Sequence, residues 1–140
     1  MKNNVIILED SSVRIERFRQ AVSELGPGFR LILWNSAHQM IRELPECIDG
    51  VVLASLDHDL ADLADGTKAG CGLDVAKYLA RHKPSFPILV HSSAADCRAA
   101  MSQALIGADW DVYNAGANGS DWIDGWLNIA RALVQRDGSV

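Results

Sequence analysis

Five short apolar runs alternate with longer stretches of helical periodicity, and this alternation constrains the fold more than any other feature of the chain. The runs cover residues 5–8, 30–34, 51–56, 88–90 and, more weakly, 110–113. The first, third and fourth are apolar on both faces, which is typical of buried parallel strands. The pattern predicts five strand–helix units and a parallel sheet covered by helices on both faces.

The intervening stretches have the periodicity of amphipathic helices. In the first of them, which starts near Ser12, Ile15, Phe18 and Val22 recur at intervals of three and four residues before Gly26 ends the helix. Further helices are predicted over residues 37–44, 73–81, 95–106 and 121–135. We therefore expect an α/β flavodoxin-like fold, a three-layer α/β/α sandwich around a five-stranded parallel sheet of order 2-1-3-4-5.

Composition limits the size of the domain and the class of its partners. The chain has 140 residues, of which 49% are hydrophobic, and a formal net charge of -5. A chain of this length can bury roughly 68% of the surface that its unfolded form exposes, so we expect a single domain over residues 1–140. The acidic balance and the lack of a Lys/Arg stripe argue against a surface for long nucleic acids.

Cysteine usage and hydropathy indicate the compartment. Cys47, Cys71 and Cys97 form no CxxC pair, and their odd number fits a reducing environment better than a disulfide framework. No run of about 18 apolar residues is present, and the apolar run at residues 5–8 is too short for a signal peptide. We expect plain thiols in a cytoplasmic protein without a membrane-spanning segment.

Chemically active side chains follow the strands. Because open α/β sheets bind ligands beyond the carboxyl ends of their strands, we expect these side chains to gather at one edge. They are Glu9-Asp10 after the first strand, Asp57-His58-Asp59 after the third, His91-Ser92-Ser93 after the fourth and Tyr113-Asn114 at the fifth.

The carboxylates in this set predict a metal site. Glu9, Asp10 and Asp57 would repel one another at neighbouring strand ends, and Mg²⁺ relieves such repulsion through oxygen ligands while leaving positions for a phosphate oxygen. Asp59 faces the same way as Asp57 in an extended strand end, so it is a further candidate ligand. The alternative is that Asp10 caps the following helix and Glu9 is solvated.

The two histidines predict acid–base chemistry. His58 and His91 follow adjacent strands and could pair across one phosphate, with one neutral and one protonated ring as base and acid. Asp57 is the third candidate catalytic residue. The alternative is that each histidine is a hydrogen-bonded structural residue.

Two further side chains are the expected phosphate contacts, namely Ser92 after the fourth strand and Arg14 in the first helix. Ser93 lies three residues before Asp96, a spacing typical of a capping box, and is the expected N-cap of the next helix. Backbone N–H groups at that helix start would favour an anion beside them.

Two further segments are candidates for a lid and for a partner-binding surface. The stretch 60–72 is long for a strand-to-helix loop, and we interpret it as a lid over the strand edge. Trp110, Trp122 and Trp126 lie in the last 31 residues, where core packing of the final helix explains them. The alternative is a Trp-rich C-terminal face that binds a protein partner or a second copy of the chain.

In their order, these residues resemble the receiver domain of two-component response regulators. The resemblance rests on Glu9-Asp10, Asp57 and Ser92, and it spans nearly the whole chain. It departs at the fifth strand, where Asn114 stands at the place at which receivers carry a lysine that contacts the phosphoryl group.

A narrower resemblance is to the cyclic-phosphate-processing receiver family. It rests on Leu8-Glu9-Asp10 with Arg14 and Phe18, on Ser55-Leu56-Asp57-His58-Asp59-Leu60, on Gly72-Leu73-Asp74-Val75-Ala76 and on Val90-His91-Ser92. That family also lacks the lysine. The resemblance implies recognition or processing of a cyclic phosphate, such as a 2′,3′-cyclic RNA end, and an association with RNA repair.

Three hypotheses of function follow. In the first, Mg²⁺ bound by Glu9, Asp10 and Asp57 supports the binding or hydrolysis of a phosphate ester, in a phosphate-containing small molecule or an RNA end. In the second, Asp57 is the phosphoacceptor of a signalling receiver. In the third, the domain is a degenerate receiver that only binds a protein partner. Because the lysine is missing and both histidines are present, we favour the first.

Overall fold

The computed structural model of the protein describes residues 2–138, with side chains through residue 135. The strands are β1 (Asn4–Leu8), β2 (Arg30–Trp34), β3 (Val51–Leu56), β4 (Ile88–Val90) and β5 (Val112–Asn114). The helices are α1 (Ser12–Leu25), α2 (Ala37–Glu43), α3 (Gly72–Leu79), α4 (Ala95–Ile106) and α5 (Trp122–Gly138), with 3₁₀ turns over Leu44–Glu46 and Ile48–Gly50. The strands pair in parallel in the order β2-β1-β3-β4-β5, so the predicted flavodoxin-like fold is confirmed.

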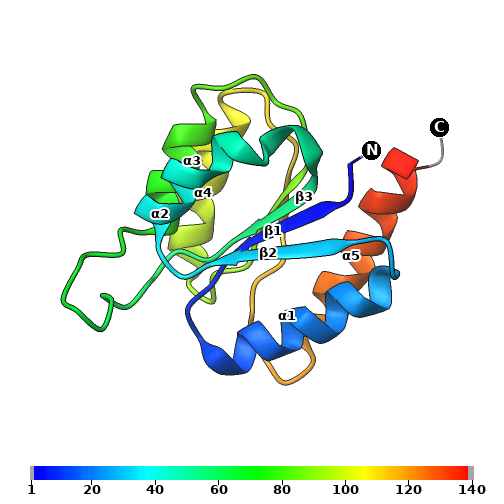
Figure 1. The fold of residues 1–140 in the computed structure, drawn as a ribbon, viewed down its shortest axis with the longest axis horizontal. Coiled ribbons are helices and arrows are strands. Elements are labelled where there is room, and N and C mark those ends of the chain that lie inside the picture. Colours follow the sequence, from blue (N-terminus) through cyan, green and yellow to red (C-terminus); the bar gives the residue numbers. More distant parts are fainter. Residues whose placement is uncertain (1, 139–140) are drawn as a thin grey trace.

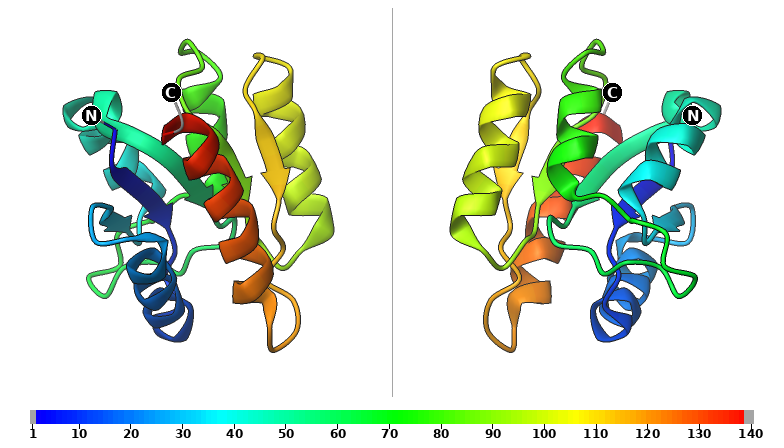
Figure 2. Two further views of the ribbon diagram at one scale, coloured as in Figure 1. Left: turned by 90° about the vertical axis from the view of Figure 1, so that its right-hand side faces the viewer. Right: turned by 90° about the vertical axis from the view of Figure 1, so that its left-hand side faces the viewer.

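The helices form layers on both faces of the sheet, with α2, α3 and α4 on one side and α1 and α5 on the other (Figure 1). Figure 2 shows the same arrangement from two further directions. Alternate residues of a strand serve the two cores, because successive side chains of a strand point to opposite faces. On β1, Ile6 and Leu8 pack with α2, α3 and α4, whereas Val5 and Ile7 pack with α1 and α5.

The element boundaries differ from the predicted ones at a few places. Strand β5 begins at Val112, because Trp110 is buried in the core before it, where its indole N–H donates to the carbonyl of Leu79 at 3.0 Å. Helix α2 ends at Glu43, and a 3₁₀ turn that contains Pro45 follows, since proline has no N–H to continue an α-helix. None of the helices in the described part of the chain is long and apolar enough to cross a membrane.

The register of the sheet decides which residues can meet at its carboxyl edge. Leu8 of β1 is the register partner of Leu56 in β3, which is in turn the partner of Val90 in β4. The residue after each of these three positions is therefore brought to the same level at the edge. Backbone hydrogen bonds extend the alignment by one residue, from the N–H of Asp57 to the carbonyl of Leu8 and from the N–H of His91 to the carbonyl of Leu56, both 3.0 Å.

Candidate functional site

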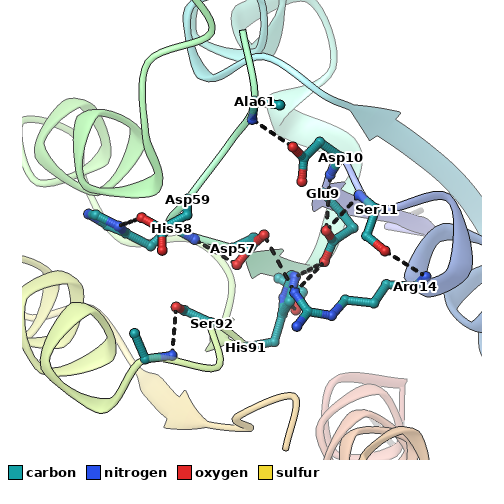
Figure 3. A network of polar contacts seen from close by, with 12 residues as sticks. Glu9, Asp10, Ser11, Arg14, Asp57, His58, Asp59, Ala61, His91 and Ser92 are labelled. Atoms are coloured by element: carbon teal, nitrogen blue, oxygen red, sulfur yellow. Dashed lines mark hydrogen bonds and ion pairs between the residues drawn. The ribbon is translucent and has the colours of Figure 1, made fainter.

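Glu9, Asp57 and His91 follow the three aligned strand positions and form one buried cluster (Figure 3). Each of them offers a side-chain oxygen or nitrogen, and these atoms all lie within 4.8 Å of one another. The sequence predicted that the side chains after neighbouring strands lie at this edge, but it paired His91 with His58 rather than with Glu9.

Glu9 is fully buried, and hydrogen bonds engage both of its carboxylate oxygens. Oε2 accepts from the backbone N–H groups of Asp10 and Ser11, each at 3.0 Å, and Oε1 accepts from Nε2 of His91 at 3.0 Å. Burial works to raise the pKa of Glu9, but the bond from His91 and the bonds and charges around it outweigh this, so the pKa lies below its ordinary value. Glu9 is therefore ionised at neutral pH.

His91 is fully buried and is held at both ring nitrogens. Nδ1 lies 2.6 Å from Oγ of Ser55, and that oxygen accepts the indole N–H of Trp126 at 2.9 Å. An ionised carboxylate only accepts, so Nε2 carries a proton toward Glu9, while the Ser55 hydroxyl lies within hydrogen-bond distance of Nδ1. The ring of Phe18 packs edge-on against the imidazole, with centroids 4.8 Å apart. Four buried side chains, Trp126, Ser55, His91 and Glu9, thus form one continuous hydrogen-bonded chain.

Asp57 is the other carboxylate of the cluster, and only 4% of it is exposed. Its Oδ1 accepts the N–H of His58 at 2.9 Å. Burial, helped by the neighbouring Glu9 carboxylate and opposed by His91 and Arg14, raises the pKa of Asp57 to about 6. Among the described residues, none donates a hydrogen bond to Oδ2, which leaves this oxygen available to a ligand.

Arg14 brings a positive charge to the rim of the cluster. Its Nη1 lies 3.7 Å from Oε1 of Glu9 and 3.8 Å from Oδ2 of Asp57, and 26% of its side chain is exposed. The side chain comes from the first turn of α1, where Oγ of Ser11 accepts the backbone N–H of Arg14 at 3.4 Å. Since both contacts are longer than a hydrogen bond and no described residue accepts from the guanidinium, its donors can bind an anion.

The donor set of this cluster fits Mg²⁺. Proteins usually hold that ion through one or two carboxylates and leave its other positions to water and phosphate oxygens. Glu9 and Asp57 supply two carboxylates at the required place. The imidazole of His91 is already occupied by Glu9 and Ser55, so the two carboxylates are the groups that would hold the ion.

The other two predicted metal ligands lie apart from this cluster. Oδ2 of Asp10 accepts the backbone N–H of Ala61, so its carboxylate turns toward the loop that follows β3 (Figure 3). Asp59 pairs with Nδ1 of His58 at 2.8 Å, and 80% of its side chain is exposed. Of the four predicted ligands, the structure brings together Glu9 and Asp57 only. The chain turns after Asp57, and the two-residue alternation of a strand ends there.

The two histidines also belong to different clusters. His91 lies in the buried one, whereas the ring of His58 lies beside Asp59, on the side of Asp57 away from Glu9 and Arg14 (Figure 3). His58, Asp59 and Cys97 form a second group whose side-chain donor atoms lie within 4.8 Å of one another. Sequence reasoning missed Cys97, because nothing in its spacing links a residue of α4 to the loop after β3.

Most of the chain matches a known protein family. Residues 6–107 match the family model described as the cyclic-phosphate processing receiver domain. This range contains both clusters, all of β2, β3 and β4, and the last three residues of β1. The chain belongs to this family.

Solved receiver domains share the fold at low sequence identity. The signal receiver domain of an HD domain-containing protein from Pseudomonas fluorescens Pf-5 has a TM-score of 0.71 at 14% identity, over 100% of both chains. The REC domain of RcsB from Salmonella enterica serovar Typhimurium, solved with the phosphomimetic BeF3-, has a TM-score of 0.63 at 20% identity, over 97% of this chain and 98% of that one. The CheX–CheY–BeF3-–Mg²⁺ complex from Borrelia burgdorferi gives 0.68 at 11% identity, over 94% and 90%. No curated protein sequence matches the chain significantly.

Ser92 and Ser93, which follow β4, differ in the contacts that they make. Ser92 is 2% exposed, and its Oγ accepts the N–H of Ala94 at 3.2 Å, so its hydroxyl hydrogen is available for another acceptor. The prediction that Ser93 caps α4 is wrong: the N-cap is Ala94, and no side chain bonds the helix start there. Helix α4 therefore begins one residue later than the capping-box spacing predicted.

The tryptophans near the C-terminus and the loop before α3 were the other two predicted features of this receiver domain. Trp110 and Trp126 are buried in the two cores, so they do not form an exposed partner surface. The loop before α3 projects from the sheet edge (Figure 1), and contacts fix it at both ends. The backbone N–H of Ala61 donates to Oδ2 of Asp10, and the carbonyl of Ala69 accepts the N–H of Ala37 at 2.7 Å.

Proposed function

We propose that this receiver domain binds the phosphate group of a phosphate ester, a 2′,3′-cyclic phosphate among them, with Mg²⁺ at the carboxyl edge of the sheet. The observation that carries the proposal is the position of Arg14, a partly exposed cation beside the free oxygen of Asp57. The description of the family as cyclic-phosphate processing agrees with this class of ligand.

Charge balance explains why a metal ion belongs in the proposal. Glu9 and Asp57 carry two negative charges when ionised, and Arg14 supplies one positive charge. An incoming phosphate adds further negative charge beside nearly buried carboxylates, which is unfavourable without another cation. A bound Mg²⁺, held by Glu9 and Asp57, would neutralise this charge and polarise a phosphate oxygen.

Each residue of the site then has a distinct task. Arg14 donates two N–H groups to phosphate oxygens, a geometry that suits guanidinium. Ser92 donates its hydroxyl hydrogen to a third oxygen. Asp57, whose Oδ2 accepts no hydrogen bond from a described residue, would hold the metal ion together with Glu9. His91 holds Glu9 in place, because its ring has no free nitrogen to reach a ligand.

Binding and turnover of 2′,3′-cyclic nucleotides with Mg²⁺ test the proposal. We expect a rise in melting temperature that requires both the nucleotide and Mg²⁺, with any hydrolysis followed by chromatography of the products. Arg14→Met should abolish the shift, and Ser92→Ala should weaken it. The matched control is Arg17→Met, which removes an exposed arginine one turn along the same helix. An Arg14→Met protein that responds as the wild type does would refute the proposal.

A second candidate function has one observation in its favour. The free Oδ2 of Asp57 stands at the end of β3 in a receiver fold, where a phosphoryl group could be accepted covalently. Treatment with acetyl phosphate, or with beryllofluoride as a mimic, should then give an adduct in the wild type that Asp57→Asn lacks. An intact-mass spectrum without a phosphoryl adduct after acetyl phosphate would exclude this function. Asn114 at the end of β5 has no charge to assist it.

A further inference from the structure

His58, Asp59 and Cys97 form a cluster of three different donor types outside the phosphate site. An imidazole nitrogen, a carboxylate oxygen and a thiol sulfur lie within 4.8 Å of one another. They come from two segments that are distant in sequence, the turn after β3 and the first turn of α4. Their meeting therefore depends on the tertiary fold and not on a local motif.

The turn that carries two of these residues is held firmly between helices. The N–H of Gly72, at the start of α3, donates to the carbonyl of His58 at 2.9 Å. A Cβ added at Gly72 would overlap the carbonyl of Asp57 and come within 2.7 Å of the sulfur of Met101 in α4. Only glycine allows this approach, so the backbone under His58 and Asp59 is fixed by packing rather than by a ligand.

The side chains themselves are accessible and able to adjust. His58 and Cys97 are half-buried, whereas 80% of the Asp59 side chain is exposed. Metal–ligand bonds of about 2.0–2.3 Å place the donor atoms of a tetrahedral site roughly 3.5 Å apart. Small side-chain rotations, chiefly of exposed Asp59, would bring the present arrangement to that spacing.

The charges around the cluster favour a cation. The carboxylates of Asp59 and Asp96 lie near the thiol, and neither pairs with a lysine or arginine among the described residues. Partial burial, followed by these two carboxylates, raises the pKa of the Cys97 thiol. The contact with His58 is thus the one side-chain pairing that the described residues give Asp59, and a bound cation would neutralise both carboxylates.

We propose that His58, Asp59 and Cys97 bind a divalent transition metal of the Zn²⁺ type, at a site separate from the Mg²⁺ site of Glu9 and Asp57. Nitrogen and sulfur ligands suit Zn²⁺, whereas Mg²⁺ takes oxygen ligands almost exclusively. Three protein ligands leave the fourth position to water or to a substrate oxygen, as in catalytic zinc sites. Binding forms a metal–sulfur bond and releases the thiol proton of Cys97 to solvent.

Titration with Co²⁺ tests the proposal directly, because a thiolate bound to Co²⁺ gives a charge-transfer band in the near ultraviolet and four-coordinate Co²⁺ gives strong visible bands. We expect the metal-free wild-type protein to develop both at one equivalent, and excess Zn²⁺ to remove them. Cys97→Ser should lose the charge-transfer band, and Asp59→Asn should bind Co²⁺ at least about tenfold more weakly.

Two matched variants separate this site from other cysteines and from the phosphate site. Cys47→Ser alters a half-buried cysteine that lies before the amino end of β3 and should leave the spectrum unchanged. Asp57→Asn should also retain the bands, while losing any response to Mg²⁺ and cyclic nucleotide. Circular dichroism confirms that each variant is folded. A wild type without the charge-transfer band, or a Cys97→Ser protein that keeps it, would overturn the proposal.

Discussion

Two clusters flank the turn at residues 57–59, and they differ in almost every physical respect. In the Glu9–Asp57–His91 cluster the side chains are buried; hydrogen bonds to core neighbours fix Glu9 and His91, and Asp57 accepts the backbone N–H of His58. In the His58–Asp59–Cys97 cluster the side chains are half-buried or exposed, and one short contact joins two adjacent residues. Consecutive residues of one chain segment thus serve two different environments, because the strand ends at Leu56 and the backbone turns.

Proximity in sequence therefore does not assign residues to one site, since His58 and Asp59 adjoin Asp57 in the chain but lie in the other cluster. The side chains of the Glu9–Asp57–His91 cluster are held in place before any ligand binds. Those of the His58–Asp59–Cys97 cluster are fixed mainly through their backbone, so their side-chain geometry can change when a ligand binds. Substitutions in the two clusters should therefore have opposite profiles, with large effects on stability in the first and small ones in the second.

Replacing the two histidines gives the largest expected contrast. His91→Ala leaves the buried Glu9 carboxylate and the Ser55 hydroxyl without their partner and opens a cavity beside Phe18. We expect a loss of about 3–5 kcal/mol in the free energy of unfolding, measured by urea denaturation. His58→Ala should cost less than about 1.5 kcal/mol. Similar losses in the two variants would contradict the distinction between the clusters.

Asp57→Asn should have a smaller effect of the opposite sign. The pKa of Asp57 rises from 3.8 to about 6 on folding, so the protonated carboxyl favours the folded state. That stability is fully present below pH 3.8 and is lost as the pH rises through 6. The substitution should therefore stabilise the metal-free protein above pH 6, by about 1–2 kcal/mol at pH 7.5, with the gain shrinking toward pH 4.

Thermal unfolding at several pH values between 4 and 8 measures this difference. Asparagine keeps an oxygen for the N–H of His58, so the comparison isolates the charge. Equal stability of the wild type and Asp57→Asn across this range would show that the surroundings do not penalise the ionised carboxylate.

Asp59→Asn should have the smallest effect on stability. The side chain is mostly exposed, so the loss of its pairing with His58 should change the free energy of unfolding by no more than about 0.5 kcal/mol in metal-free buffer. With Zn²⁺ present, the wild type should gain melting temperature and the variant should gain much less. A large loss without metal would mean that the pair has a structural role.

The fold could be predicted from the sequence because its strands are apolar runs with little polar interruption. The boundaries of β2, β3, β4 and α4 are those predicted, and the misplaced start of β5 reflects Trp110, an apolar residue that packs outside the strand. The polar Ser55 within apolar β3 was a usable sign of a buried contact, since a hydroxyl in a core needs partners.

The site could be predicted only to the level of backbone positions. Strand ends placed Glu9, Asp57 and His91 at one edge, among a larger set of polar residues whose grouping the pattern did not give. The direction of Asp10 could not be foreseen, because it depends on the N–H of Ala61 in a loop without a regular pattern. The separation of Asp59 from Asp57 depends on the turn, which Gly72 permits from fifteen residues further along the chain.

The position of a bound phosphate tests the central claim most directly. A crystal structure with Mg²⁺ and a 2′,3′-cyclic nucleotide should place the phosphate between Arg14 and Ser92, beside Oδ2 of Asp57, with the metal ion on Glu9 and Asp57. A phosphate bound instead at His58 and Cys97, with Arg14 still turned to the two carboxylates, would contradict the assignment of the buried cluster as the phosphate site.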